Sequence, residues 1–327
     1  MMIGRVPVLL ALMLVATVGV ALATDPTRDW LGYPPTDAEM ELIQVSEHAY
    51  YVQGVAGVPS ANQGFVSNAG VVITDDGVVV FDALGTPSLA VKLLQRIREI
   101  TDQPVKRVIV SHYHADHVYG LQVFQDLGAE VVAAAGSELY IDSGAGDQRL
   151  QERKVSLAPW INERTRVVRP DVYVERSERF SLGGVDFELT ALGAAHSDAD
   201  LAMYVATDRV LFSGDIIFEG RVPFVGDANS RHWLQTLERL DTGHLEALVP
   251  GHGPAASDPN QAIRLTRRYL AYLRETMGAA VDELVPFDEA YASTDWSEFE
   301  GLPAFDAAHR RNAYQVYLAL EAEALGP

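Results

Sequence analysis

The chain has 327 residues, of which 48% are hydrophobic and 21% are charged, as expected of a globular protein that buries one or two cores. Its 25 basic and 45 acidic side chains give a formal net charge of -20, and the basic residues form no patch beyond short pairs. Such a surface repels polyanions, so a small-molecule substrate is expected and a nucleic acid is not. The lack of cysteine excludes disulfides, thiolate metal ligands and a cysteine nucleophile.

The N-terminus resembles an export signal. Residues 1–23 combine Arg5, a long apolar stretch and the small residues Ala21 and Ala23, a pattern typical of a cleaved secretory signal peptide. A retained membrane anchor is the alternative, because the apolar stretch is nearly long enough to span a bilayer. We expect cleavage, and hence a periplasmic or secreted protein without a stable membrane span. Residues 24–40 carry proline and charge without a sustained period, which predicts a surface leader or a loosely ordered segment.

The first half of the chain alternates between strand and helix patterns. The segment "GFVSNAGVVITDDGVVVFDA" predicts two strands joined by a hairpin turn at Asp75-Asp76-Gly77. Leucine and isoleucine at helical spacing predict a helix from residue 88 that ends before Pro104. A buried strand, a helix and a further strand are predicted next, over residues 105–112, 117–129 and 130–135.

The second half repeats this order after a less regular segment. Residues 137–170 are expected to form an insertion of loop and short helix near the site, where a long connection can determine specificity. The later patterns predict strands over 185–196, 201–207, 209–215 and 245–253, and helices over 231–242, 260–284 and 307–325. We therefore divide the chain into a catalytic domain, residues 41–258, and a helical C-terminal extension, residues 259–327.

The segment "SHYHADH", residues 111–117, places three of the nine histidines directly after a predicted strand. Side chains i and i+2 of a strand share one face, so His112 and His114 can point to the same spot. Asp116 and His117 follow where a helix begins, and the backbone amides there favour an acidic side chain. Four candidate metal ligands therefore converge on one loop.

Three further candidates stand at the ends of predicted strands: His196, Asp215 and His252. Loops at strand ends bring distant residues around a ligand in layered α/β proteins. Imidazole and carboxylate groups suit Zn(II), and would also suit Fe or Mn, whereas calcium and magnesium draw on oxygen alone. Five histidines and two aspartates exceed one tetrahedral set, so the sequence predicts two metal ions that share a carboxylate.

These motifs resemble those of a known family. The pattern His-x-His-x-Asp-His at residues 112–117 is similar to the signature of the metallo-β-lactamase superfamily. The resemblance spans about residues 62–255 and includes, in the family's order, "NAGVVITDDGVVVFDA", "AAHSDADLAMYV", "VLFSGDIIF" and "VPGHGP". It implies an α/β fold, a four-layer αββα sandwich with a pair of metal ions at one edge.

The resemblance also implies how the ligands divide between the two metals. The first metal is expected on His112, His114 and His196, the second on Asp116, His117 and His252, and Asp215 is expected to bridge them. Asp82 matches a family aspartate that supports the ligand loop by hydrogen bonding. A turn residue at the end of a strand is the alternative interpretation of Asp82.

The expected chemistry is hydrolysis. A metal pair lowers the pKa of bound water from about 15.7 toward neutrality, which makes hydroxide the expected nucleophile on an ester, thioester, lactone or lactam carbonyl. Asp116 is the candidate catalytic residue, because it can orient this nucleophile and accept its proton as well as bind metal. Family members that cleave β-lactams commonly have cysteine or serine at the position of Asp215. The aspartate therefore favours the thioesterase, lactonase and phosphodiesterase branches over a true β-lactamase.

Two other hypotheses keep the fold and change the role. Relatives that oxidise persulfides hold a single iron with two histidines and an aspartate, but the complete second set of ligands here favours hydrolysis. The whole chain also resembles, more weakly, the exported zinc metallohydrolases of quinoprotein relay systems. This resemblance leaves open a non-catalytic, metal-binding accessory role in a periplasmic oxidation system.

The remaining polar and aromatic residues near the motifs favour structural roles. Ser111 and Ser197 suit turns or caps, and Tyr113 and Tyr119 suit packing. Residues 219–229 could form one rim of the site, but we expect ordinary roles for the two candidates there, a solvated Arg221 and a packed Phe224. The other histidines are expected at the surface or in packing: His48, His232, His244 and His309.

Overall fold

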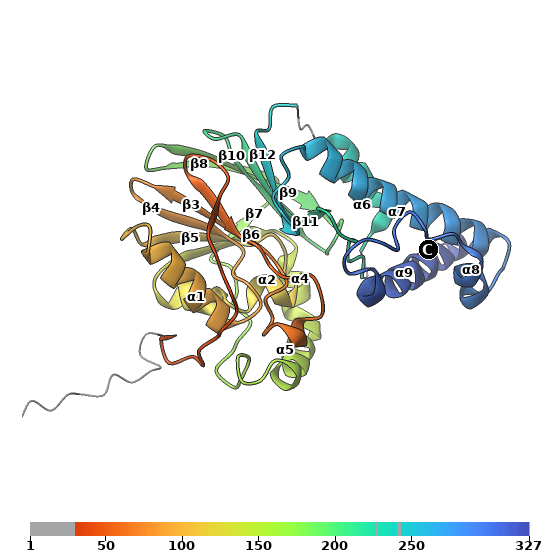
Figure 1. Ribbon diagram of the computed structural model, residues 1–327, viewed down its shortest axis with the longest axis horizontal. Coiled ribbons are helices and arrows are strands. Elements are labelled where there is room, and N and C mark those ends of the chain that lie inside the picture. Colours follow the sequence, from red (N-terminus) through yellow and green to blue (C-terminus); the bar gives the residue numbers. More distant parts are fainter. Residues whose placement is uncertain (1–29, 227, 241–242, 327) are drawn as a thin grey trace, which may run out of the picture.

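Two β-sheets packed face to face dominate the computed structural model (Figure 1), which describes residues 30–226, 228–240 and 243–326. Helices cover the outer face of each sheet, and a group of helices extends from one end of the sandwich. The predicted four-layer αββα sandwich with C-terminal helices is confirmed. The predicted signal peptide lies outside the described residues, and a separate domain after residue 258 stays a prediction.

The first sheet has seven strands. In spatial order they are β1 (Ile43–Gln44), β2 (Ala49–Val52), β3 (Ala69–Thr74), β4 (Gly77–Phe81), β5 (Val105–Ile109), β6 (Glu130–Ala134) and β7 (Val172–Val174). Neighbours from β1 to β4 are antiparallel, and neighbours from β4 to β7 are parallel. Thr74 pairs with Gly77 across the turn between β3 and β4, so the predicted hairpin is confirmed.

The second sheet has five strands. In spatial order they are β12 (Ala247–His252), β11 (Val210–Phe218), β10 (Asp200–Val205), β9 (Val185–Gly193) and β8 (Ser177–Leu182). Among the described strands of this sheet, only β11 and β12 are parallel neighbours. Phe212 of this sheet and Phe81 of the first sheet meet between the two layers, with ring centroids 5.7 Å apart.

Strand β4 is buried on both of its faces, and its side chains point alternately to two different cores. Val78 and Val80 pack into the core beneath the first layer of helices, whereas Val79 and Phe81 pack into the core between the sheets. All four side chains are buried, and burying each one contributes about 1.5–3 kcal/mol of hydrophobic free energy. An uninterrupted apolar strand is what a sheet buried on both faces requires.

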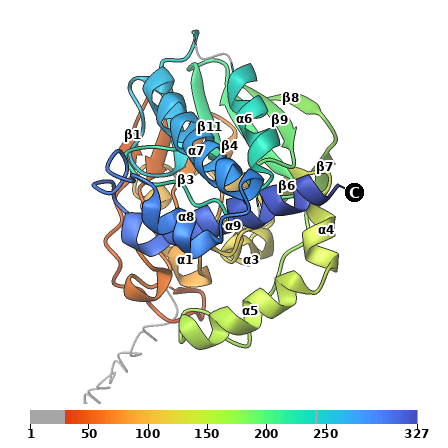
Figure 2. The ribbon, with the colours of Figure 1, turned by 90° about the vertical axis from the view of Figure 1, so that its right-hand side faces the viewer.

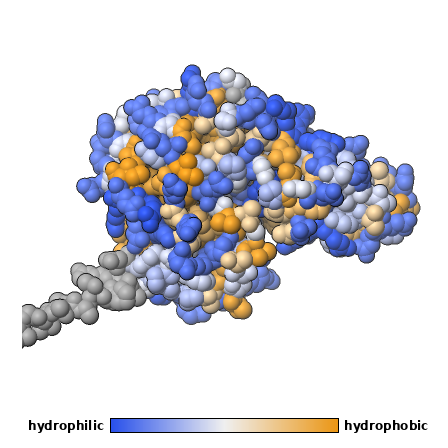
Figure 3. Space-filling view, viewed as in Figure 1, coloured by the Kyte–Doolittle hydropathy of each residue, from blue (hydrophilic) through white to orange (hydrophobic). Residues whose placement is uncertain are grey.

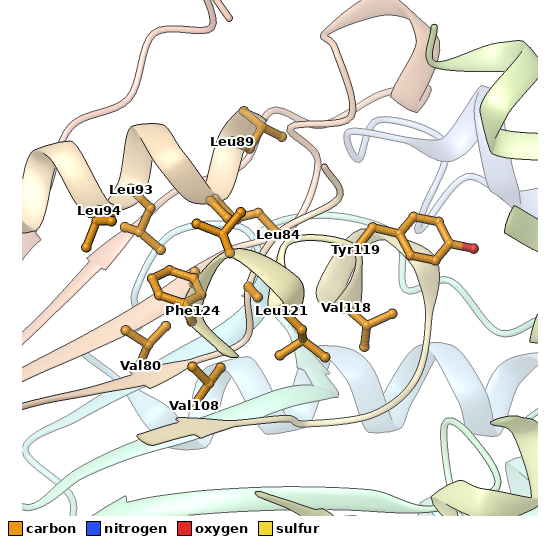
Figure 4. Packing of buried hydrophobic residues seen from close by; sticks show 14 of the residues in the cluster. Val80, Leu84, Leu89, Leu93, Leu94, Val108, Val118, Tyr119, Leu121 and Phe124 are labelled. Carbon is orange, nitrogen blue, oxygen red and sulfur yellow. The ribbon is translucent and has the colours of Figure 1, made fainter. Parts of the chain in front are cut away.

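Helices α1 (Pro87–Arg98), α2 (Ala115–Val118) and α3 (Leu121–Asp126) cover the first sheet. Figure 4 shows apolar residues of α1, such as Leu93, beside Phe124 of α3 and Val80 of β4. Thr86 begins α1, where its hydroxyl accepts a hydrogen bond from the amide of Leu89. The predicted helix before Pro104 ends earlier than expected, at Arg98.

The single helix predicted over residues 117–129 is wrong, because the chain forms two short helices there. The break lies at Gly120, where an added Cβ would stand 1.9 Å from the carbonyl oxygen of Ala83. The backbone must pass this close to the first sheet, and only glycine permits the approach. The bend separates the turn of α2, which carries two candidate metal ligands, from the packing helix α3.

The inserted segment and the C-terminal part are helical. The predicted insertion contains α4 (Ser137–Asp142) and α5 (Ala145–Ser156), and α5 lies below α9 in Figure 2. The other helices are α6 (Ser230–Arg239), α7 (Pro259–Asp282), α8 (Phe287–Ser293), α9 (Phe305–Leu325) and the 3-10 helix η2 (Pro59–Ala61). Helix α8 was not predicted, because its polar and aromatic residues show no sustained helical period.

Residues 30–40 lie at the surface, as one of the two expectations for the leader had it, but buried anchors hold them, so they are not loosely ordered. Tyr33 and Met40 are buried in the first core, and the hydroxyl of Tyr33 accepts a hydrogen bond from the Gln122 amide at 2.5 Å. Proline and charge in this segment therefore conceal two packing anchors. Within the described residues, no helix combines the length and the apolar character that a membrane crossing needs.

Candidate metal centre

The loop after β5 carries the first four candidate ligands. The chain leaves the strand at Ile109 and enters α2 at Ala115, so Asp116 lies in the first turn of a helix as predicted. The rings of His112 and His114 lie close together, with centroids 4.5 Å apart, and His112 and His117 are buried. The strand end followed by a helical turn thus directs all four side chains to one region.

The second sheet supplies the other three candidates. His196 follows β9 and His252 ends β12, as expected, but Asp215 lies inside β11 rather than at its end. This strand continues to Phe218, because "IIF" after the aspartate is as apolar as the residues before it. The structure brings these three residues to the four from the first sheet.

The seven residues form two groups joined by one carboxylate. Potential ligand atoms lie within 4.8 Å of one another in His112, His114 and His196, and likewise in Asp116, His117 and His252. Asp215 contacts both groups: its Oδ2 lies 3.3 Å from Nε2 of His196 and 3.2 Å from Nε2 of His252. Its Oδ1 lies 3.3 Å from Nε2 of His117.

These distances suit ligands of a common cation. Two nitrogen or oxygen ligands about 2.0–2.1 Å from a tetrahedral zinc ion are roughly 3.3 Å apart. The contacts of Asp215 at 3.2–3.3 Å have this spacing, while Asp215 Oδ2 is 4.0 Å from Nε2 of His112. The His and Asp clusters are therefore compatible with metal binding.

Hydrogen bonds behind the rings fix which nitrogen faces the centre. Nδ1 of His117 donates to Oδ2 of Asp82 at 2.8 Å, and Nδ1 of His252 donates to the carbonyl of Val66 at 2.7 Å. Each proton on Nδ1 leaves the lone pair of Nε2 free for a cation. Nε2 of His117 and Nε2 of His112 are buried without a hydrogen-bond partner among the described residues, which is the state that a metal ligand requires.

Asp82 organises the ligand loop through Ser111. Its Oδ1 accepts a hydrogen bond from the Ser111 amide and its Oδ2 accepts one from the Ser111 hydroxyl, both at 2.7 Å. The same hydroxyl lies 2.9 Å from Nδ1 of His112 and can accept its proton. Asp82 therefore supports His117 directly and His112 through one serine. The supporting role implied for Asp82 matches this geometry, and Ser111 has a more specific part than a turn residue.

A short segment before β3, which no motif in the sequence singles out, connects the two halves of the centre by hydrogen bonds. The hydroxyl of Ser67 donates to the carbonyl of Asp116 at 2.5 Å. The side chain of Asn68 donates to the carbonyls of Pro250 and Gly253, which flank His252. Both residues are buried, but serine and asparagine before a strand are so common that no spacing distinguishes them.

Glycines allow the second sheet to approach the centre closely. A Cβ on Gly251 would stand 1.9 Å from Oδ1 of Asp215. Gly214 has a φ of +54°, and a Cβ there would stand 2.5 Å from Cβ of Ser111. Glycine directly before Asp215 and before His252 is therefore a steric requirement of the site.

Burial and charge set the protonation of the ligands. Burial lowers the pKa of His196 to about 3 and the pKa of His112 well below its ordinary value, so both rings are neutral. Burial also lowers the pKa of His117, but the carboxylates of Asp215 and Asp82 outweigh it and raise this pKa well above the ordinary value. Burial raises the pKa of Asp215, but His252 and His117 outweigh it and hold this pKa well below its usual range. Buried carboxylates thus need positive charge beside them, which a bound cation supplies.

The centre lies at the floor of a cavity of about 650 Å³. Arg221 and Phe224 both line it, so the expectation of a solvated Arg221 is wrong, since only 7% of this residue is exposed. Tyr113 is a packing residue as expected, and its hydroxyl donates to the carbonyl of Val168 at 2.8 Å. Tyr119 is buried as expected. Three lining arginines were missed because helical sequence alone does not show which face meets a cavity: Arg149, Arg153 and Arg311.

The expected minor roles of the other residues agree with the structure. Ser197 forms a turn, with its hydroxyl bonded to Asp200 and accepting from the Ala199 amide. The four remaining histidines are absent from the clusters of potential ligands found among the described residues. Their contacts lie elsewhere: His48 with Asp208, His232 with the carbonyl of Ala194, His244 with Tyr204, and His309 within a group of aromatic rings.

Comparison with known proteins identifies the family. A family model described as the metallo-β-lactamase superfamily matches residues 62–252, more than half of the chain and all seven candidate ligands. The chain belongs to the metallo-β-lactamase superfamily. Members of this superfamily are mostly hydrolases, so the expected metallohydrolase is confirmed at the level of the superfamily.

Relatives in the superfamily differ in activity. The chain is 22% identical over 251 residues to a linear primary-alkylsulfatase of Pseudomonas sp. (strain ATCC 19151), covering 64% of this chain and 47% of the relative. It is 28% identical over 155 residues to the acyl-coenzyme A thioesterase MBLAC2 of Gallus gallus, covering 44% of this chain and 55% of the relative. The chain thus spans about half the length of these curated relatives.

A solved structure shows the same fold. The metallo-β-lactamase from Pontibacter korlensis aligns with a TM-score of 0.57 and 22% sequence identity, over 71% of this chain and 99% of that one. The names of the three relatives cover a sulfate ester, a thioester and a β-lactam, so membership of the superfamily leaves the substrate bond open.

Proposed function

We propose that this chain is a hydrolase that holds two zinc ions and uses a metal-activated hydroxide to cleave an ester, thioester, lactone or related bond. The observation that carries the proposal is the position of Asp215. Its two carboxylate oxygens reach the ligand groups on both sides at 3.2–3.3 Å, which is the arrangement of a bridge between two cations.

In this proposal each ligand has one role. His112, His114 and His196 would hold one ion, Asp116, His117 and His252 would hold the other, and Asp215 would be shared between them. Bound ions would lower the pKa of water so that hydroxide is available near neutral pH, and they would stabilise negative charge on the substrate. Asp82 and Ser111 keep the rings of His117 and His112 in the required orientation.

Of the two candidate aspartate ligands, Asp116 is the more open to the cavity. Its side chain is 26% exposed, against 3% for Asp215, and it lines the cavity. Burial raises the pKa of Asp116, but the charges of His117 and His252 outweigh it and keep the carboxylate ionised at neutral pH. An ionised carboxylate accepts a hydrogen bond from the attacking water and so orients it. The new bond joins the water oxygen to the substrate, the bond to the leaving group breaks, and the leaving group takes the proton.

A panel of substrates tests this function. We expect turnover of at least one ester, thioester or lactone that increases with added zinc and stops with chelator, and a chromogenic cephalosporin reports true β-lactamase activity in the same assay. Asp116→Asn should lower turnover more than metal content if the residue orients water. Hydrolysis that is unaffected by chelator would contradict the proposal.

Metal analysis separates the alternatives. One iron per chain together with oxygen uptake on a persulfide would support the oxidative hypothesis instead of hydrolysis. Bound metal without turnover of any substrate class would support the accessory role. Two zinc ions with chelator-sensitive hydrolysis agree only with the proposed function.

We also propose export, on the pattern of residues 1–23, and a place among the exported metallohydrolases of quinoprotein relay systems. The full-length chain, expressed in a Gram-negative host, should appear in the periplasm or the medium with an N-terminus close to Thr24. A chain that keeps its first residues and stays with the membrane would contradict cleavage.

A further inference from the structure

The cavity above the candidate metal centre concentrates positive charge in an acidic protein. The chain has 45 acidic and 25 basic side chains, yet four arginines line this one cavity: Arg149, Arg153, Arg221 and Arg311. Its acidic lining consists of Asp116 and Asp215, which are proposed metal ligands, and the exposed Asp198. With two divalent cations at the floor, the cavity would be strongly attractive to anions.

Arg221 is the most constrained of the four arginines. It is 7% exposed, and its Nε is buried without a hydrogen-bond partner among the described residues. Its Nη1 lies 3.5 Å from Nδ1 of His252, whose proton already goes to Val66 at 2.7 Å. A buried guanidinium that lacks a bound carboxylate is costly, and a ligand that supplies an anion removes this cost.

Arg311 reaches the same side of the cavity from α9. Its guanidinium carbon lies 5.6 Å from the centre of the Phe224 ring, and Phe224 also lines the cavity. The next residue, Asn312, is buried and hydrogen-bonds Pro223 and Val225, so α9 is fixed against the segment that carries Arg221. No ion pair to Arg311 occurs among the described residues, whereas the adjacent Arg310 pairs with Asp288 outside the cavity.

Helix α5 contributes two further arginines to the cavity, Arg149 and Arg153. Arg149 pairs with Glu152, but Arg153 makes no ion pair within the described part of the chain. Apolar side chains complete the lining, among them Val58 and Leu139, which are 51% and 64% exposed. Figure 3 shows that apolar residues reach the surface around α4 and α5, while most of this face is polar. The cavity therefore offers both cationic groups and apolar surface.

We propose that the substrate carries an anionic oxygen group that is separate from the bond that is cleaved. Arg221 and Arg311 hold this group, and a short apolar part of the substrate connects it to the cleaved bond. The group is a carboxylate, a sulfate or sulfonate, or a phosphate, since a guanidinium binds all three with paired N–H donors. This inference rests on the proposed hydrolase function and adds the substrate class. It also gives α9 a role, because Arg311 brings the C-terminal helices into substrate selection.

Matched esters test the proposal in the protein as purified with its metals. Mono-4-nitrophenyl glutarate and 4-nitrophenyl pentanoate have the same leaving group and chain length and differ in one terminal carboxylate. We expect kcat/KM to be at least about tenfold higher for the glutarate, because its carboxylate forms charge-assisted hydrogen bonds with the guanidinium groups; tenfold corresponds to about 1.4 kcal/mol. Esters that end in a sulfonate or a phosphonate identify which anion is preferred.

Variants of the arginines show which side chains cause the preference for the charged ester. Arg311→Gln should remove most of the preference for the charged ester, while Arg310→Gln, at an exposed residue paired with Asp288 outside the cavity, should preserve the rates of both esters. Arg221→Lys keeps the charge but not the fork of donors, so it should lower the preference without loss of metal. Equal rates for both esters in the wild type, or a preference that survives in both variants, would overturn the proposal.

A binding measurement distinguishes this failure from failure of the hydrolase function. If no ester is cleaved, calorimetric titration with monomethyl glutarate and with dimethyl glutarate still compares an anion with its neutral match. We expect the monoanion to bind at least about tenfold more tightly, and the difference to disappear in Arg311→Gln but not in Arg310→Gln. No difference in the wild type would overturn the anion site, whatever the reaction.

Discussion

The floor and the wall of the cavity are built in different ways. At the floor, most candidate ligands are buried and hydrogen bonds with other buried groups fix their orientation; Nδ1 of His117, for example, donates to Asp82 at 2.8 Å. On the wall, the arginines come from α5, α9 and the segment after β11. Among the described residues Arg153, Arg221 and Arg311 form no ion pair, whereas Arg149 pairs with Glu152. We therefore expect the residues of the floor to determine the reaction, and the residues of the wall to determine which substrate is preferred.

This difference has a physical basis. A metal site tolerates errors of only a fraction of an ångström in its ligands, so each ligand needs a second group that holds it. A cationic wall acts through longer-ranged attraction and tolerates movement of its side chains. Changes at the floor should therefore affect all substrates equally, and changes on the wall should affect the choice between them.

The largest effect is expected from Asp215. Asp215→Ala removes the carboxylate that contacts both ligand groups, so metal content and hydrolysis should be lost together for every substrate. Metal analysis and the ester assay measure this, with Asp208→Asn as the control, because Asp208 is also a buried carboxylate but contacts His48 far from the clusters. Full activity with an intact fold would disprove the bridge.

A smaller loss is expected from Asp82. Asp82→Asn keeps the shape of the side chain but weakens the acceptor for His117 and for Ser111, which supports His112. Replacing such a group typically costs about 10–100-fold in metal affinity or activity. Zinc titration monitored by activity measures the loss, and the preference for charged esters should stay unchanged. A changed preference would mean that floor and wall are not independent.

A steric test follows for Gly251. Gly251→Ala puts a methyl group 1.9 Å from Oδ1 of Asp215, so either the carboxylate or the strand must move. We expect a loss of about 1–3 kcal/mol in the free energy of unfolding, together with weaker metal binding. Gly278→Ala in α7 is the matched control. Its nearest neighbour lies 3.9 Å away, and helix propensity predicts a gain of up to about 1 kcal/mol.

The smallest effect concerns stability rather than the site. Burial raises the pKa of Asp208, but hydrogen bonds from Ser46 and His48 outweigh it and hold this pKa below its ordinary value. A depressed pKa stabilises the fold above the ordinary aspartate pKa of about 3.9, and this contribution is lost as pH falls through the folded-state value. The stability difference between wild type and Asp208→Asn should therefore shrink below about pH 4. Denaturant unfolding at several pH values measures it, and a difference that grows on acidification would contradict the assignment.

The layered fold, and the gathering of the seven candidate ligands in one place, could be predicted from the sequence because both depend on local patterns. Apolar strands alternating with helices, and histidines at strand ends, can be recognised without knowledge of contacts. Three errors had physical causes that no pattern shows. Gly120 divides a helix because of a contact with Ala83, Asp215 lies inside a strand that continues to Phe218, and Tyr33 anchors a proline-rich leader.

The wall could not be predicted from the sequence. Arg310 and Arg311 are neighbours of one type on one helix, and only packing of α9 decides that Arg311 meets Phe224 and the cavity. Burial of Arg221 likewise depends on long-range packing, since most arginines are solvated. Ser67 and Asn68 support the floor through hydrogen bonds to residues far along the chain, which a local pattern does not record.

The metal content of the purified wild-type chain decides whether two ions share Asp215. Elemental analysis combined with protein quantification should give two divalent ions per chain after incubation with zinc and removal of the excess. Two ions per chain, with loss of both in Asp215→Ala, are what a shared carboxylate predicts. A single ion in the wild type, or two ions that persist without Asp215, would contradict it.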